Sequence, residues 1–330
     1  MLRTSKSIAK ILSSFIFAAL LFGCGSNELR EPSVQEATTE SQITKVPTVV
    51  PEVEPQEMEF ADTPTEHVQG KKVLYIGHSF GRPFARELPS FVEMVGIDNH
   101  VQEIVFRGGP NGSPQSLWED AKVRQEIQNI LAEGDTDLLV MICCSENFLE
   151  SRQSDWAVEN WIDYALSVNP DTDFALALPW PDYPEDYENN EAYSERIIEA
   201  HASAWHPFID DLRDLYPQSE IQSIFHGRAA IELRGLFESG SLPEIREMTS
   251  KRPPGIFTDR KGHAGQILLD LGTLIWLGTI YDIDMNDFPV SELKINGESY
   301  ETDLVAIAQE ILDQEEVKER MIEWYSENAE

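Results

Sequence analysis

Short apolar runs alternate with helical stretches along most of the chain, and this alternation limits the fold more than any other feature. Neighbouring parallel strands need a crossover connection, so strands that alternate with helices predict a parallel sheet covered on both faces. The expected fold class is therefore α/β, a three-layer α/β/α sandwich with a central parallel sheet. We expect strands near 72–76, 101–106, 138–142, 173–178 and 221–225, and helices near 83–95, 114–132, 155–167 and 191–215.

The last part of the chain predicts a small addition to this sandwich. Residues 264–280 are apolar nearly all round, which is typical of a buried helix. Beyond them, Asn296-Gly297 is typical of a tight hairpin turn, and 302–325 has the pattern of an acidic amphipathic helix. We expect a domain over 71–285, with the hairpin and the helix of 286–330 packed on it.

The first residues have the pattern of an export signal. Basic residues precede an apolar run over 11–22, which is shorter than the roughly 20 residues that span a bilayer. The run ends at Leu21-Phe22-Gly23-Cys24, which resembles the lipobox of bacterial lipoproteins. The resemblance implies a signal peptide over 1–23, lipidation of Cys24 and attachment to a membrane through that lipid. Gly25 after the cysteine favours, by the same resemblance, an outer-membrane lipoprotein of the cell envelope.

Composition narrows the classes of partner and cofactor. Residues 24–70 are rich in Pro, Glu, Thr and Val with Phe60 as the one aromatic residue, so we expect a disordered tether. The formal charge of -34 would repel nucleic acid and anionic membrane surfaces, which argues against both as partners. Besides Cys24, the cysteines are the adjacent Cys143 and Cys144, which lack zinc-ligand spacing. We expect no structural disulfide, no metal and no cofactor.

A serine lies where reactive residues gather in a parallel sheet, at the carboxyl end of a strand. The sequence Gly77-His78-Ser79-Phe80-Gly81 follows the first predicted strand and precedes a helix, whose N-terminus favours an oxyanion. The pentapeptide matches the G-x-S-x-G elbow of α/β-hydrolases, but that elbow follows several strands. Residues 73–80 instead resemble the first block of the SGNH (GDSL-type) hydrolases, with His78 where Asp or Asn is usual. The resemblance implies a flavodoxin-like sandwich and makes Ser79 the nucleophile.

The second half of this resemblance lies far downstream. Residues 257–265 are similar to the family's last block, a D-x-x-H before the final core helix, although here Asp259 and His263 are spaced D-x-x-x-H. A histidine takes the serine proton and a carboxylate fixes its tautomer, so His263 is the expected base and Asp259 its partner. The alternatives are that His263 only caps the helix, or that His226 is the base. His201 and His206 fall on a predicted helix, and we interpret them as surface or packing residues.

The resemblance covers residues 71–282 and is weaker in its middle blocks. It implies an oxyanion hole built from the serine N–H, a glycine N–H and an asparagine side chain. Gly109 or Gly112, after the second strand, supplies the glycine. Asn147 is the expected third donor; Glu146 occupies the matching position, but an ionised carboxylate only accepts.

The expected activity is that of a serine esterase acting on small acyl esters, with O-acetyl groups on carbohydrates as one candidate substrate. Two alternatives remain open at this point. One is a catalytically silent lipoprotein that binds a glycan or a protein, and the other is an O-acyltransferase. The proline-rich segment 179–187 follows a strand; its aromatic residues either contact a sugar or belong to an ordinary ordered loop.

Overall fold

Five parallel strands form the central sheet of the computed structural model, which describes residues 68–142 and 157–314. The strands are β1 (Lys72–Gly77), β2 (Val101–Phe106), β3 (Leu138–Ile142), β4 (Asp173–Ala177) and β5 (Ile221–Ile224). Their order in the sheet is β2-β1-β3-β4-β5, and every pairing is parallel. All residues of β3 are buried, as expected for a central strand covered on both faces.

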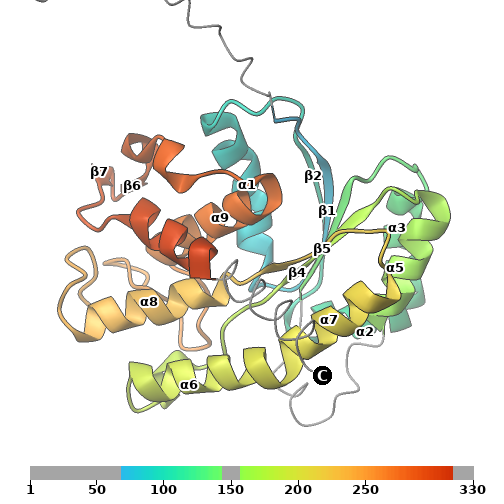
Figure 1. Ribbon diagram of the computed structural model, residues 1–330. Coiled ribbons are helices and arrows are strands. Elements are labelled where there is room, and N and C mark those ends of the chain that lie inside the picture. Colours follow the sequence, from blue (N-terminus) through green and yellow to red (C-terminus); the bar gives the residue numbers. More distant parts are fainter. Residues whose placement is uncertain (1–67, 143–156, 315–330) are drawn as a thin grey trace, which may run out of the picture. The chain divides into compact units, whose positions relative to one another are not determined.

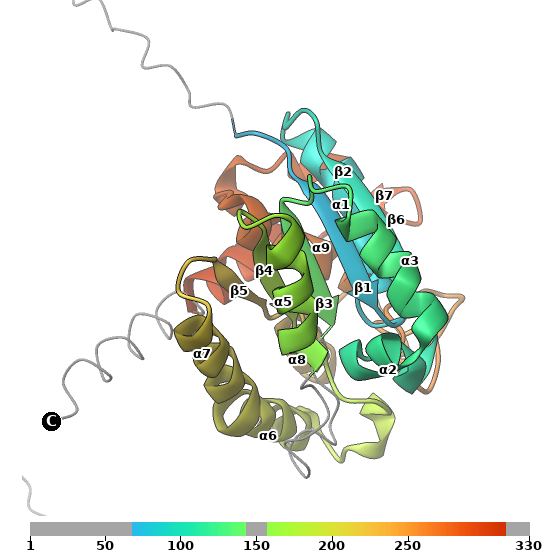
Figure 2. The same cartoon turned by 90° about the vertical axis from the view of Figure 1, so that its right-hand side faces the viewer.

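Helices cover the sheet on two sides (Figures 1 and 2). One layer holds α1 (Arg82–Met94), α8 (Gly227–Glu238) and α9 (Gln266–Tyr281). The other holds α2 (Pro114–Glu119), α3 (Ala121–Leu131), α5 (Ala157–Val168) and α7 (His206–Leu215), while α6 (Asn190–Ala200) contacts α8. The predicted three-layer α/β/α sandwich is confirmed.

Two predicted helices are interrupted. The helix expected over 114–132 is two helices, because Asp120 is extended and its carboxylate accepts hydrogen bonds from the backbone N–H groups of Lys122 and Val123. The helix expected over 191–215 contains a π-helical stretch, His201–Trp205, between α6 and α7. His201 begins this stretch and His206 follows it. Both side chains are buried, so they are packing residues and not surface residues.

The C-terminal addition packs on α9 and on the segment after α8. It contains two 3-10 turns, Met285–Asp287 and Val290–Glu292, and a hairpin of β6 (Lys294–Ile295) and β7 (Glu298–Ser299). Asn296 and Gly297 both have positive φ, at 55° and 85°, as the predicted Asn-Gly turn requires. Residues 304–314 are helical; the predicted remainder of that helix lies outside the described residues.

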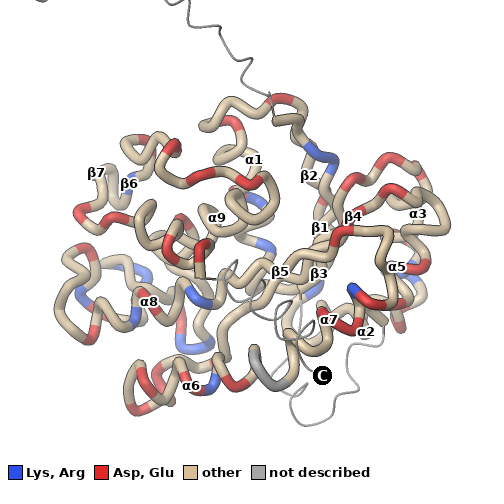
Figure 3. Tube along the Cα trace, in the orientation of Figure 1, with Lys and Arg blue, Asp and Glu red and all other residues tan. Residues whose placement is uncertain are grey.

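Acidic residues are spread over the helices of both layers (Figure 3). Among residues 68–142 and 157–314, no helix has both the length and the apolar character to cross a membrane. The same residues contain no group of three His, Cys, Asp or Glu side chains arranged to hold a metal ion. Cys24, Cys143, Cys144, Glu146 and Asn147 lie outside the described residues, as do the predicted signal peptide and tether.

Candidate active site

The turn after β1 presents Ser79. Both glycines of the G-x-S-x-G sequence lie against the buried ring of Tyr75: a Cβ on Gly81 would lie 2.5 Å from Tyr75 Oη, and one on Gly77 would also collide with that ring. The Tyr75 hydroxyl donates to the carbonyl of His78 at 2.9 Å and so supports the turn from below. The glycines therefore allow the turn to close over a tyrosine, a role different from that of a mid-sheet elbow.

Residues 258–263, the relay loop, form a tight turn before α9. Gly262 N–H donates to Asp259 O at 2.9 Å, and Thr258 N–H donates to His263 O at 2.7 Å. Gly262 has a φ of +97°, a conformation that glycine adopts without strain. This turn absorbs the additional residue of the D-x-x-x-H spacing, because it folds the chain back so that the side chains of Asp259 and His263 meet.

The structure brings three of the predicted residues into one hydrogen-bonded chain. His263 Nε2 lies 2.9 Å from Ser79 Oγ, although the two residues are 184 positions apart. His263 Nδ1 lies 2.7 Å from Asp259 Oδ2, and the His263 N–H donates to Asp259 Oδ1 at 3.3 Å. A proton on Nδ1, shared with the carboxylate, leaves Nε2 free to accept the serine proton, which is the tautomer a general base needs.

The Asp259 carboxyl is held in its ionised form. Burial alone would raise its pKa, but hydrogen bonds from the ring and the backbone of His263 outweigh burial, and the pKa lies below its ordinary value. An ionised Asp259 stabilises a positive charge on the adjacent imidazole. The arrangement is therefore suited to taking a proton from Ser79 and holding it on His263.

Two other histidines surround the turn without joining the chain. His226 is fully buried, and its ring nitrogens face the carbonyls of Phe80 at 3.1 Å and Ile224 at 3.3 Å. Burial lowers the pKa of His226 to about 4. Its ring nitrogens contact backbone carbonyls and not Ser79 Oγ, which contacts His263, so His226 is a structural residue and not the base. His78 accepts the Phe80 N–H on Nδ1 at 3.3 Å, and burial followed by the charge of Lys261 lowers its pKa to about 4.

The candidate oxyanion donors differ in how closely they approach the turn. Gly112 is buried, and a Cβ on it would lie 2.5 Å from Gly77 O and 2.7 Å from His78 Cβ, so its backbone lies directly against the serine turn. Gly109 has a φ of +56° and more open surroundings. Arg107 N–H donates to Gly77 O at 3.1 Å and joins this loop to the end of β1. Within the described residues, the Ser79 N–H has no hydrogen-bond acceptor.

Sequence analysis singled out the aromatic residues of 179–187 but did not predict the contact that Trp180 makes at the site. Trp180 is only 3% exposed and its indole N–H donates to Gly262 O at 2.9 Å. Its ring contacts the Phe80 ring at 5.0 Å between centroids, so it is not available to contact a sugar. Tyr183, at 46% exposure, is the solvent-facing aromatic of that segment. The position of Trp180, just after β4 at the same edge as Ser79, is the signal that marks it.

Fold and site together define an α/β/α protein with a serine, a histidine and an aspartate in one chain of hydrogen bonds. No protein-family model matches the sequence, and no curated protein matches it significantly. Solved structures are similar at low identity, among them the three that follow. A DUF4886 family protein from Bacteroides uniformis is 13% identical, with a TM-score of 0.48 over 74% of this chain and 95% of that one.

Two further similar structures have smaller TM-scores. The periplasmic domain of a lipopolysaccharide acetyltransferase from Salmonella ser. Paratyphi A is 12% identical, with a TM-score of 0.33 over 49% of this chain and 68% of that one. A family 3 carbohydrate esterase from Clostridium thermocellum is 15% identical, with a TM-score of 0.37 over 64% of this chain and 96% of that one.

Proposed function

We propose that the protein is a serine esterase of the SGNH type that hydrolyses small acyl esters, with O-acetylated carbohydrates as the first substrates to test. One observation supports this proposal most strongly: Ser79 Oγ, the His263 ring and the Asp259 carboxylate are joined by contacts of 2.9 and 2.7 Å. A serine hydroxyl is a weak nucleophile on its own, and an adjacent base that is itself held by a carboxylate activates it.

The reaction would follow from this geometry in two stages. Ser79 Oγ attacks the ester carbonyl carbon while its proton passes to His263 Nε2, and the imidazolium then gives that proton to the departing alcohol. Water, deprotonated by His263, next attacks the acyl-serine; the carboxylic acid leaves, and the imidazolium returns its proton to Ser79 Oγ. The negative charge on the carbonyl oxygen would be stabilised by the N–H groups of Ser79 and of Gly112 or Gly109, with Asn147 as the proposed third donor.

A Ser79→Ala substitution tests the proposal directly. The variant is expected to lose hydrolysis of a short-chain aryl ester and covalent labelling by a fluorophosphonate probe, because both reactions need the serine oxygen. Ser90→Ala is the matched control, since Ser90 is an exposed serine on α1 whose hydroxyl donates only to Glu87 O. Turnover retained by Ser79→Ala would reject the assignment.

The phosphonate labelling, combined with a glycan-binding and an acyl-transfer measurement, separates the alternatives. A wild-type protein that binds a glycan but does not react with the phosphonate would be a binding protein with this fold. Acyl transfer to a sugar hydroxyl that exceeds hydrolysis in a mixed assay would indicate an acyltransferase.

We also propose that the protein is exported and anchored in the outer membrane through a lipid on Cys24, as the sequence Leu21-Phe22-Gly23-Cys24 suggests. A Cys24→Ser variant is expected to lose metabolic labelling by a fatty acid and to leave the membrane fraction. Labelling that persists in this variant would contradict the proposal.

A further inference from the structure

Residues 179–187, which we call the brace, run beside the relay loop and contact it repeatedly. The Trp180 indole donates to Gly262 O at 2.9 Å, and the Tyr183 N–H donates to Lys261 O at 3.0 Å. Two ion pairs lie along the same line: Asp182 with Lys261 at 3.5 Å and Asp186 with Arg260 at 3.0 Å. The brace therefore touches every residue that lies between Asp259 and His263.

The brace is itself firmly held on its other side. Arg234 of α8, only 2% exposed, donates to Pro184 O at 2.6 Å and to Tyr187 O at 3.0 Å. A buried guanidinium that donates several hydrogen bonds fixes the backbone it contacts, because its planar donors have a defined geometry. The contacts to the relay loop thus start from a rigid segment.

The contact at Gly262 leaves no free space. A Cβ on Gly262 would lie 2.8 Å from Pro184 Cδ and 3.4 Å from Trp180 Nε1. Its carbonyl receives the Trp180 bond, while its N–H closes the turn onto Asp259 O. Since Gly262 immediately precedes His263, any rotation of its peptide group moves the imidazole.

We propose that Trp180 is a positioning residue for His263: its indole N–H, by holding the Gly262 carbonyl, keeps the imidazole aligned between Ser79 and Asp259. This inference rests on the proposed esterase function, and it explains how a D-x-x-x-H loop reaches the geometry of the shorter spacing. Arg260 and Asp186 are exposed at the surface, so their ion pair contributes less than the indole bond.

The test compares Trp180→Phe with Trp276→Phe. The two tryptophans pack on the same rings: their centroids lie 6.0 and 6.1 Å from Phe84, and 5.7 and 5.8 Å from His226. Trp276 is fully buried and its indole N–H has no partner within the described part of the chain, so its substitution trims the core without releasing the relay loop.

Trp180→Phe is expected to lower kcat for a short-chain aryl ester about tenfold to a hundredfold at unchanged KM, since small displacements of a catalytic group are costly. The acidic limb of its kcat/KM profile should shift to lower pH, because a misaligned Asp259 stabilises the imidazolium less well. Trp276→Phe should lose thermal stability but keep kcat per folded molecule and the wild-type pH limb. Equal losses in both variants with an unmoved limb would overturn the proposal.

A glycine pair provides the same test without touching either tryptophan. Gly262→Ala places a methyl group against Pro184 and should lower kcat as Trp180→Phe does. Gly240→Ala is its control, because Gly240 also has positive φ, at 73°, but open space around its Cβ position. A Gly262→Ala enzyme with wild-type kcat would reject the positioning role. If the wild-type protein neither hydrolyses esters nor labels with the phosphonate, the proposed function itself fails.

Discussion

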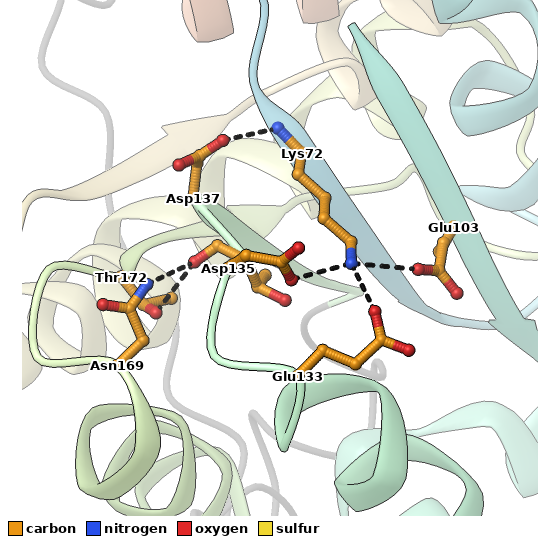
Figure 4. A network of polar contacts seen from close by, with 8 residues as sticks. Lys72, Glu103, Glu133, Asp135, Asp137, Asn169 and Thr172 are labelled. Atoms are coloured by element: carbon orange, nitrogen blue, oxygen red, sulfur yellow. Dashed lines mark hydrogen bonds and ion pairs between the residues drawn. The ribbon is translucent and has the colours of Figure 1, made fainter.

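The two ends of the central sheet both contain charged networks, but the networks are of different kinds. At the end where the strands begin, Lys72 Nζ lies 2.7 Å from Glu133, 2.7 Å from Asp135 and 3.6 Å from Glu103 (Figure 4). Hydrogen bonds from the ammonium to Asp135 and Glu133 raise the Lys72 pKa well above its usual range. The Lys72 ammonium is surrounded by carboxylates, and this structural pairing accounts for it.

At the end where the strands finish, the polar side chains form a line instead of a cluster. Asp259 pairs with one nitrogen of His263, and the other nitrogen faces the Ser79 hydroxyl. The Ser79 proton can pass to His263, whose imidazolium form the Asp259 carboxylate stabilises, whereas the Lys72 cluster only holds its proton more tightly. The comparison shows that directionality, and not the number of charged groups, separates a candidate catalytic site from a structural ion cluster.

The largest effect that tests this comparison is expected from Asp259→Asn. The amide would no longer hold the Nδ1–H tautomer of His263, and kcat should fall on the order of 10⁴-fold, as loss of the carboxylate does in serine relays. Aryl-ester kinetics measure the fall, and circular dichroism checks that the fold is retained. A loss of less than about tenfold would mean that the line of contacts is not used as a relay.

A third network, at α9, contains a carboxyl group whose titration is set by burial. Burial raises the pKa of Asp270 from 3.8 to about 6, although the Tyr300 hydroxyl at 2.6 Å and Gln266 at 2.7 Å oppose the shift. Asp270 therefore keeps its proton in the folded state at a pH where it has lost that proton in the unfolded chain. The contribution to stability is complete below about pH 4 and is lost as pH rises through about 6, a change of about 3 kcal/mol.

Asp270→Asn removes this titration. The free energy of unfolding of the variant, relative to wild type, is expected to rise by about 3 kcal/mol between pH 3 and pH 7, because the other carboxyl groups contribute equally to both proteins. Urea titrations at several pH values measure the difference. A difference that does not change with pH would show that Asp270 titrates alike in the folded and unfolded chains.

The sheet and the ends of its strands followed from the sequence because they depend on local patterns. Short apolar runs, the first of them stopped by Gly77, predicted the strands, and the rule that reactive residues lie at carboxyl ends of parallel strands placed Ser79. His263 and Asp259 were predicted from a motif at the start of the last core helix. The α9 helix itself was evident from its nearly continuous apolar character.

The parts that were not predicted depend on contacts between distant segments or on a close competition between local hydrogen bonds. Trp180 bonds to a carbonyl 82 residues away, and no periodicity in either loop indicates that pairing. Asp120 ends one helix and caps the next through its side chain. This extended, capping conformation competes closely with continuation of the helix. The two contacts of the His226 ring, to Phe80 O and Ile224 O, likewise result from packing.

A smaller effect is expected at the opposite end of the sheet, from Lys72→Met. Its carboxylate partners are between 36% and 61% exposed, so removing the ammonium should lower the free energy of unfolding by about 1 to 2 kcal/mol in total. The loss should shrink in about 1 M salt, where screening shortens the range of charge interactions. The kcat per folded molecule is expected to equal that of wild type, and a fall like that of Asp259→Asn would contradict the distinction between the two ends.

The smallest effect is expected beside Ser79 itself, from His78→Asn. His78 uses Nδ1 to accept the Phe80 N–H, and with a pKa of about 4 its ring is neutral in the range where His263 would act. An asparagine oxygen can accept from the N–H two residues ahead, so His78→Asn should retain kcat/KM within about tenfold, the equivalent of one hydrogen bond, whereas His78→Ala should lose more. Aryl-ester kinetics of the two variants measure this order. If His78→Asn lost as much as Asp259→Asn, His78 would belong to the line of proton transfer, and the site would contain two working imidazoles.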